Sequence, residues 1–158
     1  MGFVEHSEEP AMNEQSHALG SDELVLAYYA AYNARDAGRI RSLIAPNFRQ
    51  ERGRGVVEGA DALVAVLEKE WQDRPDSRID VREVTAAGDR VFAEAAWVVS
   101  SLNPVTLPDG STLQPTGQRA TLPMAAVYDL RDGLLASERA YYNNLALWRD
   151  LGPTITIT

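Results

Sequence analysis

The sequence contains no cysteine, and its two histidines, His6 and His17, both lie in a polar N-terminal stretch. The missing cysteines exclude disulfides, thiolate nucleophiles and thiolate metal sites. The rest of the chain lacks histidine, so a histidine base or a histidine metal site in the core is also excluded. No phosphate loop, dinucleotide fingerprint or zinc motif occurs. We therefore expect no metal ion and no cofactor.

Positive charge and long apolar runs are also scarce. The formal net charge is −8, whereas binding to nucleic acid or to an anionic membrane needs clustered lysine and arginine. No apolar run approaches the length of a membrane span, and the first residues lack the basic and apolar blocks of a signal peptide. We expect a cytoplasmic protein that has neither nucleic acid nor a membrane as partner.

A chain of 158 residues, 45% of them hydrophobic, has room for one domain with a proper core. Residues 1–20 are polar and without a sustained period, so we expect a mobile leader there. Residues 21–152 are expected to form a single domain, followed by a short C-terminal tail at 153–158.

Three segments, 21–33, 36–45 and 60–74, have the apolar spacing of helices. Ser21 is the expected N-cap of the first helix and Asp36 that of the second. A short strand is expected at 48–52. An alternating strand follows at 78–82, with a turn at 87–89, and further strands are expected at 91–102, 119–130 and 134–142. Residues 103–117 form either a long loop or a splayed hairpin. Because no helix joins the late strands, we predict an α+β fold with an antiparallel sheet.

Several short strings, in this order and spacing, resemble the SnoaL-like polyketide cyclases of the nuclear-transport-factor-like superfamily. The resemblance covers about residues 22–152. It rests on Tyr32-Asn33-Ala34-Arg35-Asp36, Ala45-Pro46-Asn47-Phe48, Pro75-Asp76, Gly88-Asp89-Arg90-Val91, Asp132-Gly133, Arg139-Ala140-Tyr141-Tyr142 and Leu147-Trp148-Arg149-Asp150-Leu151-Gly152.

The resemblance implies a cone, in which a curved antiparallel sheet wraps around about three N-terminal helices and encloses a pocket. It also implies a catalytic aspartate on the last strand, but that position here is Ala140, and a second acidic position is Asn143. The related limonene epoxide hydrolases use an aspartate–arginine–aspartate set, and two of its positions fall at Ala95 and Trp97 here. The usual catalytic aspartate of the cyclases and the epoxide-opening set are therefore both missing.

Strand alternation then selects the side chains that share the pocket face with Ala140. These residues, together with helix residues placed at the floor or mouth, form a largely apolar and aromatic wall suited to a lipophilic ligand. The predicted substrate-binding residues are Tyr28, Tyr32, Phe48, Leu67, Trp71, Ala95, Trp97, Val99, Leu122, Met124, Ala126, Ala140 and Tyr142.

Three polar residues are the catalytic candidates. Glu138 is the only carboxylate on the inferred face of the last strand, and burial would raise its pKa into a useful range; alternatively it forms an ion pair with Arg52 or lies on the rim. Arg52 could stabilise an enolate, or it could belong to a solvated basic loop with Arg49 and Arg54. Gln50 is a neutral donor to a substrate carbonyl.

We therefore expect a cofactor-independent cyclase or isomerase acting on a lipophilic, polyketide-like intermediate. Ring closure would be acid–base assisted, or pericyclic and promoted by the shape of the pocket. The alternatives are a non-catalytic binder of a hydrophobic molecule and a dimerising interaction module whose pocket is filled by its own Trp97, Tyr142 and Trp71. In each case we expect a homodimer, because two-fold pairing is the common way to cover an open sheet face.

Overall fold

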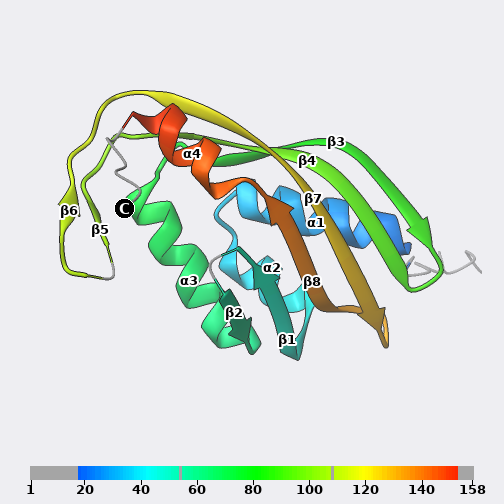
Figure 1. Cartoon of the computed structure of the whole chain (residues 1–158). Coiled ribbons are helices and arrows are strands. Elements are labelled where there is room, and N and C mark those ends of the chain that lie inside the picture. The colour runs from blue at the N-terminus through cyan, green and yellow to red at the C-terminus, as the bar shows by residue number, and fades with distance from the viewer. Residues whose placement is uncertain (1–17, 54, 108, 153–158) are drawn as a thin grey trace, which may run out of the picture.

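The computed structural model describes residues 18–53, 55–107 and 109–152, so most of the expected leader and the expected tail lie outside it. Figure 1 shows a curved sheet that arches over the helices. The helices are α1 (Ser21–Asn33), α2 (Ala37–Leu43), α3 (Ala60–Asp73) and α4 (Asn144–Leu151). The strands are β1 (Ile44–Arg52), β2 (Gly55–Glu58), β3 (Arg78–Ala87), β4 (Arg90–Ser100), β5 (Val105–Thr106), β6 (Thr112–Leu113), β7 (Arg119–Arg131) and β8 (Leu134–Tyr142).

The six-stranded sheet has the order β2-β1-β8-β7-β4-β3. Neighbours are antiparallel except for β1 and β8, which run parallel. The predicted α+β class and curved sheet are confirmed, and the expectation of a purely antiparallel sheet is corrected at this one pair. The physical reason is connectivity: no hairpin turn joins β1 to β8, so the direction of β1 is not set by a tight connection.

The N-terminal ends of the first two helices show how short-range chemistry sets their bounds. The predicted Asp36 cap is confirmed, since its Oδ1 accepts a hydrogen bond from the Arg39 amide at 2.8 Å. The predicted Ser21 cap is wrong by one residue. Gly20 is the N-cap, and its amide donates to Glu23 Oε2 at 3.1 Å. Ser21 begins the helix, and its hydroxyl donates to the Gly88 carbonyl.

The second helix is shorter than the predicted segment 36–45. The helix ends at Leu43, and Pro46 lies within β1. The β1–β8 register shifts between Ile44 and Arg49, a tolerable place for a residue that has no amide hydrogen to donate. Of the two alternatives for residues 103–117, the structure shows the hairpin, because β5 and β6 pair antiparallel.

The helix α4 was not predicted. Asn143 caps it, with its Oδ1 accepting a hydrogen bond from the Ala146 amide at 3.1 Å. Gly152 ends it with a positive φ of 87°, a conformation that glycine adopts without strain. Asn143 follows the last residue of β8 and caps α4, and Asn144 is the first residue of this helix, which packs against β7.

The core lies between α1 and the inner face of the sheet. Along β4, Val91, Ala93 and Ala95 are buried whereas Phe92 and Glu94 are exposed, as strand alternation requires. Tyrosines make up much of the core: the rings of Tyr28, Tyr29 and Tyr128 lie about 6 Å apart. None of the helices in the described ranges has the length and apolar character needed to cross a bilayer.

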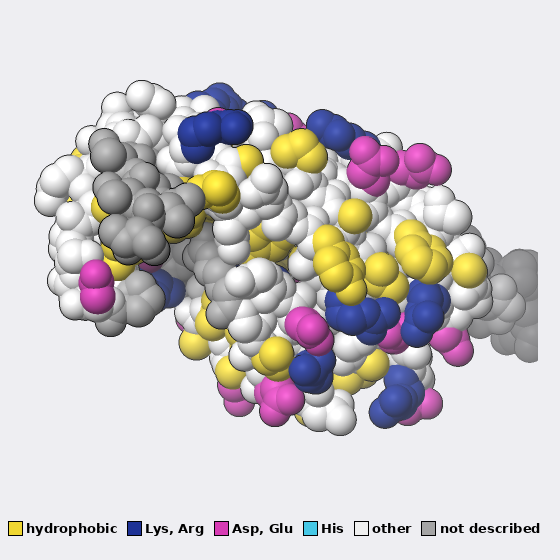
Figure 2. Space-filling view, viewed as in Figure 1, with side chains coloured by type: hydrophobic (Ala, Val, Ile, Leu, Met, Phe, Trp, Pro, Cys, Tyr) yellow, Lys and Arg dark blue, Asp and Glu magenta, His cyan; other side chains and the backbone are white. Residues whose placement is uncertain are grey.

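The outer face of the sheet carries apolar side chains that no helix covers. Phe92 on β4 and Tyr141 on β8 are 48% and 60% exposed, and Pro123 and Ala125 on β7 lie with them around a shallow concavity. Figure 2 shows hydrophobic side chains gathered over β4, β7 and β8, flanked by arginines and acids. We call this surface the outer apolar face.

Asn33, at the end of α1, tethers the edge strand β3. Its amide nitrogen donates to the Ile79 carbonyl at 2.8 Å, and its amide oxygen accepts from the Ile79 amide at 2.7 Å.

We expect Asn33→Ala to lower the free energy of unfolding by about 1–2 kcal/mol, since two net hydrogen bonds are lost. Urea denaturation measures this, with Asn47→Ala at an exposed position of β1 as the control. Equal stability of the two variants would contradict the tether.

Candidate functional site

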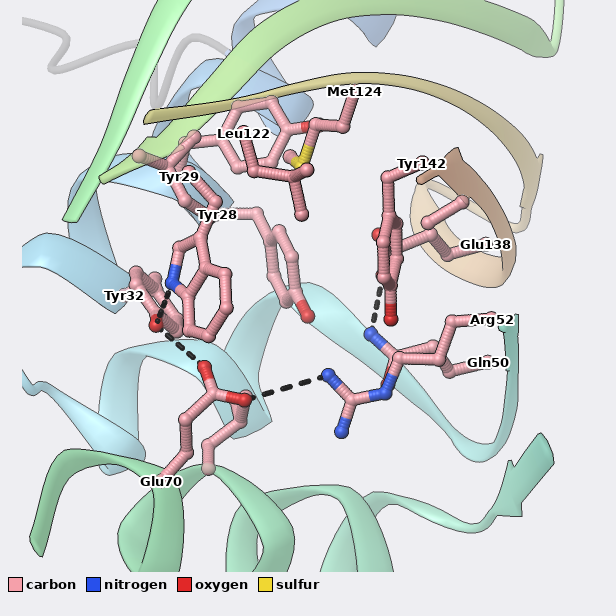
Figure 3. Close-up of a pocket in the computed structure, with 14 residues that line it drawn as sticks. Tyr28, Tyr29, Tyr32, Gln50, Arg52, Glu70, Leu122, Met124, Glu138 and Tyr142 are labelled. Atoms are coloured by element: carbon pink, nitrogen blue, oxygen red, sulfur yellow. Dashed lines mark hydrogen bonds and ion pairs between the residues drawn. The ribbon is translucent and has the colours of Figure 1, made fainter. Parts of the chain in front are cut away.

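A cavity opens between α1, α3 and the inner face of the sheet (Figure 3). Its volume is about 70 Å³, enough for a few water molecules. Apolar and aromatic side chains form most of the wall, and four polar side chains interrupt it. The lining residues are Tyr28, Tyr29, Tyr32, Gln50, Arg52, Leu67, Glu70, Ile79, Trp97, Leu122, Met124, Glu138, Ala140 and Tyr142.

The structure brings all three catalytic candidates, Glu138, Arg52 and Gln50, to this cavity. Of the predicted substrate-binding residues it also places there Tyr28, Tyr32, Leu67, Trp97, Leu122, Met124, Ala140 and Tyr142. Trp97 and Tyr142 form walls of the cavity and do not fill it.

Five predicted binding residues do not line the cavity, namely Phe48, Trp71, Ala95, Val99 and Ala126. The ring of Phe48 is fully buried and packs 6.5 Å from that of Tyr28, which does line the cavity. Trp71 packs on the Tyr32 ring at 5.8 Å. The other three are buried in the sheet, where alternation gave the correct face but the short side chains of Ala95 and Ala126 end below the cavity wall.

Glu138 lies in a row of side chains that crosses three strands. Its register partners are Gln50 on β1 and Tyr128 on β7. Gln50 Nε2 donates a hydrogen bond to Glu138 Oε2 at 2.7 Å. Glu138 and Gln50 are only 5% and 4% exposed, so this is a buried polar pair inside an apolar cone.

Burial raises the pKa of Glu138 above its ordinary value of 4.5, because the ionised form loses its hydration. The Gln50 hydrogen bond and the positive charge of Arg52 oppose that shift without cancelling it. A carboxyl group with a raised pKa can exchange a proton near neutral pH, as general acid–base catalysis requires.

Arg52 pairs with a different acid from the one expected. Its Nη1 lies 3.6 Å from Oε2 of Glu70 on α3, and both side chains are largely buried. Tyr32 donates a hydrogen bond to Glu70 Oε1 at 2.5 Å, and Trp97 Nε1 donates to the Tyr32 hydroxyl at 3.0 Å. Arg52 thus belongs to the cavity wall, not to a solvated loop, while Arg54 lies outside the described residues.

Glu70, Tyr29 and Ile79 also line the cavity and were missed from the sequence. Glu70 follows Leu67 by three residues on one face of α3, so an acid in the apolar stripe of a helix was the available signal. Tyr29 adjoins Tyr28, and both are buried because α1 is covered on more than one side. Ile79 occupies the first part of β3, where the sequence offered no distinguishing signal.

One buried polar atom on the cavity wall has no partner. Gln50 Oε1 makes no hydrogen bond to any of the described residues. A buried, unpaired polar group is costly. A ligand that carries a hydroxyl or amide donor can satisfy this atom.

The polar groups of the cavity are suited to moving protons. Among the described residues, no group of three acidic or histidine side chains comes together as a metal site. Glu138 can exchange a proton, and Arg52 presents a fixed positive charge. Figure 3 shows the side chains of Tyr28 and Tyr142 pointing into the cavity, toward Arg52.

A family model described as the SnoaL-like domain matches residues 25–138. The chain belongs to this family. Its match covers α1 to β8 and therefore includes most of the cavity wall of this SnoaL-like protein. A comparison with curated protein sequences found no match.

Solved structures share the fold of this SnoaL-like protein along most of its length. IdmH of Streptomyces antibioticus is 19% identical, with a TM-score of 0.73 over 85% of this chain and 100% of its own. Proteins of Jannaschia sp. and Pseudomonas putida are 24% and 26% identical, with TM-scores of 0.72 and 0.71. They cover 85% and 84% of this chain and 93% and 98% of their own. All three are described as putative polyketide cyclases.

The raised pKa of Glu138 predicts a definite pH dependence of stability. A carboxyl group with a raised folded-state pKa contributes most below its unfolded value near 4.5, and that contribution is lost as the pH rises through the folded-state pKa. We expect Glu138→Gln to remove this loss, so the variant gains stability over the wild type as the pH rises above 4.5. Unfolding curves across this range measure it, with the exposed acid variant Glu68→Gln as control. A constant difference between wild type and Glu138→Gln would contradict the assignment.

Proposed function

We propose that this SnoaL-like protein is a cofactor-independent cyclase or isomerase that acts on a lipophilic, polyketide-like intermediate. The family and the neighbours described as polyketide cyclases support a role of this type. The observation that carries the proposal is the buried Glu138 carboxyl on the wall of an apolar cavity, next to Gln50 and Arg52.

In the proposed reaction, the Glu138 carboxylate removes a proton from the carbon next to a ligand carbonyl. The C–H electron pair becomes an enolate, whose oxygen is stabilised by Arg52 or by the Gln50 amide. The enolate carbon then forms a C–C bond to a second carbonyl carbon, and the resulting alkoxide takes the proton back from Glu138. No electron acceptor is needed, and every proton is accounted for.

Gln50 has two parts in this scheme. Its amide nitrogen holds the Glu138 carboxyl in place at 2.7 Å, and its unpaired Oε1 can accept a hydrogen bond from a ligand hydroxyl. The aromatic walls formed by Tyr28, Trp97 and Tyr142 suit a flat or folded apolar chain. Such walls would also promote a pericyclic closure, which needs no base.

The proton-transfer step can be tested without the natural substrate by using 2-tetralone, an apolar ketone with exchangeable α-protons. We expect the wild-type protein to accelerate exchange of these protons in D₂O, followed by NMR. Loss of an acid–base residue typically lowers such rates by a factor of about 100 or more, so Glu138→Gln should reduce exchange to that extent. Glu68→Gln, an exposed acid on α3, should retain the wild-type rate.

The result separates the rival functions. Full activity in Glu138→Gln would remove this residue from the chemistry. Binding of 2-tetralone without accelerated exchange would leave either closure by pocket shape or a non-catalytic binder of hydrophobic molecules. No binding of 2-tetralone or of a broader lipophilic panel in thermal-shift measurements would favour an interaction module.

We also propose that the protein is a homodimer that pairs through the outer apolar face. Phe92 and Tyr141 are large, exposed and adjacent to other apolar side chains there, and closed two-fold pairing covers such a face in both copies at once. Size-exclusion chromatography with light scattering should give twice the mass of 17.3 kDa. Phe92→Glu should shift the protein to the monomer, and the control Leu102→Glu, an exposed leucine after β4, should not. A wild-type monomer at micromolar concentration would contradict the proposal.

A further inference from the structure

The cavity wall contains one positive and two acidic side chains. Arg52 is the single basic residue among the fourteen described residues that line it, and it faces Glu70 and Glu138. Two acidic groups and one basic group disfavour the entry of an anion, even though a guanidinium is the usual partner for a ligand carboxylate. Whether Arg52 is available to a ligand depends on Glu70.

The Glu70 carboxylate is fixed by contacts other than the one to Arg52. Its Oε1 accepts the short hydrogen bond from Tyr32, and its Oε2 lies 3.6 Å from Arg52 Nη1. Tyr32 is 3% exposed and is itself held by Trp97 Nε1. Figure 3 shows the line of contacts from Tyr32 through Glu70 to Arg52. The positive charge of Arg52 is thus compensated from within the protein.

We propose that Glu70 is a specificity-determining residue: by holding Arg52 in a neutral pair, it makes the cavity select uncharged, oxygen-bearing ligands over carboxylates. The inference rests on the proposed function in that the cavity must admit a small molecule. It names the chemical class of that molecule, a ketone, ester, amide or phenol and not a free acid.

The cost of admitting a carboxylate follows from the contacts. A ligand anion loses its hydration in the largely apolar cavity, and that loss must be repaid by a cation. Here it would have to compete with Glu70 for Arg52 in the presence of Glu138. An uncharged ligand avoids this competition. Its donor group can reach the unpaired Gln50 Oε1, and its carbonyl can accept a hydrogen bond from an arginine N–H that Glu70 does not use.

Two ligand pairs of nearly equal shape test the proposal: benzamide with benzoate, and 2-naphthamide with 2-naphthoate. Dissociation constants come from ligand-observed NMR or calorimetry at one pH and one ionic strength. We expect the wild type to bind each amide at least about tenfold more tightly than its carboxylate, which corresponds to about 1.4 kcal/mol. Glu70→Gln keeps an acceptor for Tyr32 but frees Arg52. The ratio of the carboxylate and amide dissociation constants should therefore shift by about tenfold or more in favour of the carboxylate.

Three controls assign the effect. Glu68→Gln makes the same charge change at an exposed position of α3 and should keep the wild-type ratio. The double variant Glu70→Gln/Arg52→Gln should lose the gain in carboxylate affinity, because the gain requires the freed guanidinium. Circular dichroism and melting curves show whether each variant is folded.

The outcomes are distinct. Equal affinity of the wild type for amide and carboxylate would overturn the inference, whatever the variants do, and would leave the proposed function standing. A gain in carboxylate affinity that persists in the double variant would also overturn it. If the wild type binds none of the four probes, the inference fails, whereas the proposed function is decided separately by proton exchange from 2-tetralone.

Discussion

The site depends on one pairing of strands, the parallel register of β1 with β8. That register sets Gln50 beside Glu138 and allows a carboxyl group to lie in the interior with its hydrogen bond made. Side chains alternate across a strand, so a slip of one residue would turn Glu138 to the outer face and bring Arg139 inside. The same slip would remove Ala140 and Tyr142 from the cavity wall. Register, more than any single contact, therefore decides whether the cavity contains an acid.

The two glutamates of the cavity differ because their surroundings differ. Glu138 has a neutral amide as its closest partner and is almost fully buried, and burial raises its pKa. Glu70 accepts a hydrogen bond from Tyr32 and lies 3.6 Å from a guanidinium nitrogen of Arg52. Glu138 thus has no charged group as its closest partner, whereas Glu70 is placed to compensate the charge of Arg52.

Much of this could be predicted from the sequence where short-range patterns decide the structure. The spacing of apolar residues located α1 and α3, the Asp36 side chain capped α2, and strand alternation put Glu138, Ala140 and Tyr142 on one face. The predictions failed where distant parts of the chain decide. The parallel β1–β8 pair and the Arg52–Glu70 contact join segments that no local pattern links. Ala95 and Ala126 face the right way, but only the packed structure shows that their side chains stop short of the cavity.

The proposed polyketide-like ligand is larger than the cavity of about 70 Å³, so its binding would require part of the wall to move, and the contacts show which side chains are held in place. Trp97 is held on two sides: its Nε1 donates to Tyr32, and its ring faces the buried Arg74 guanidinium at 5.5 Å. Arg74 also faces the ring of Trp148 on α4 at the same distance, so α4 supports this wall from behind. Met124 lies on the same inner face of the sheet, paired with Ala95 on the strand that carries Trp97, and it is half-buried and unbranched. Methionine changes rotamer at low cost and fits irregular shapes. A rotamer change of Met124 therefore reshapes the apolar wall without breaking the hydrogen bonds that join Trp97, Tyr32 and Glu70.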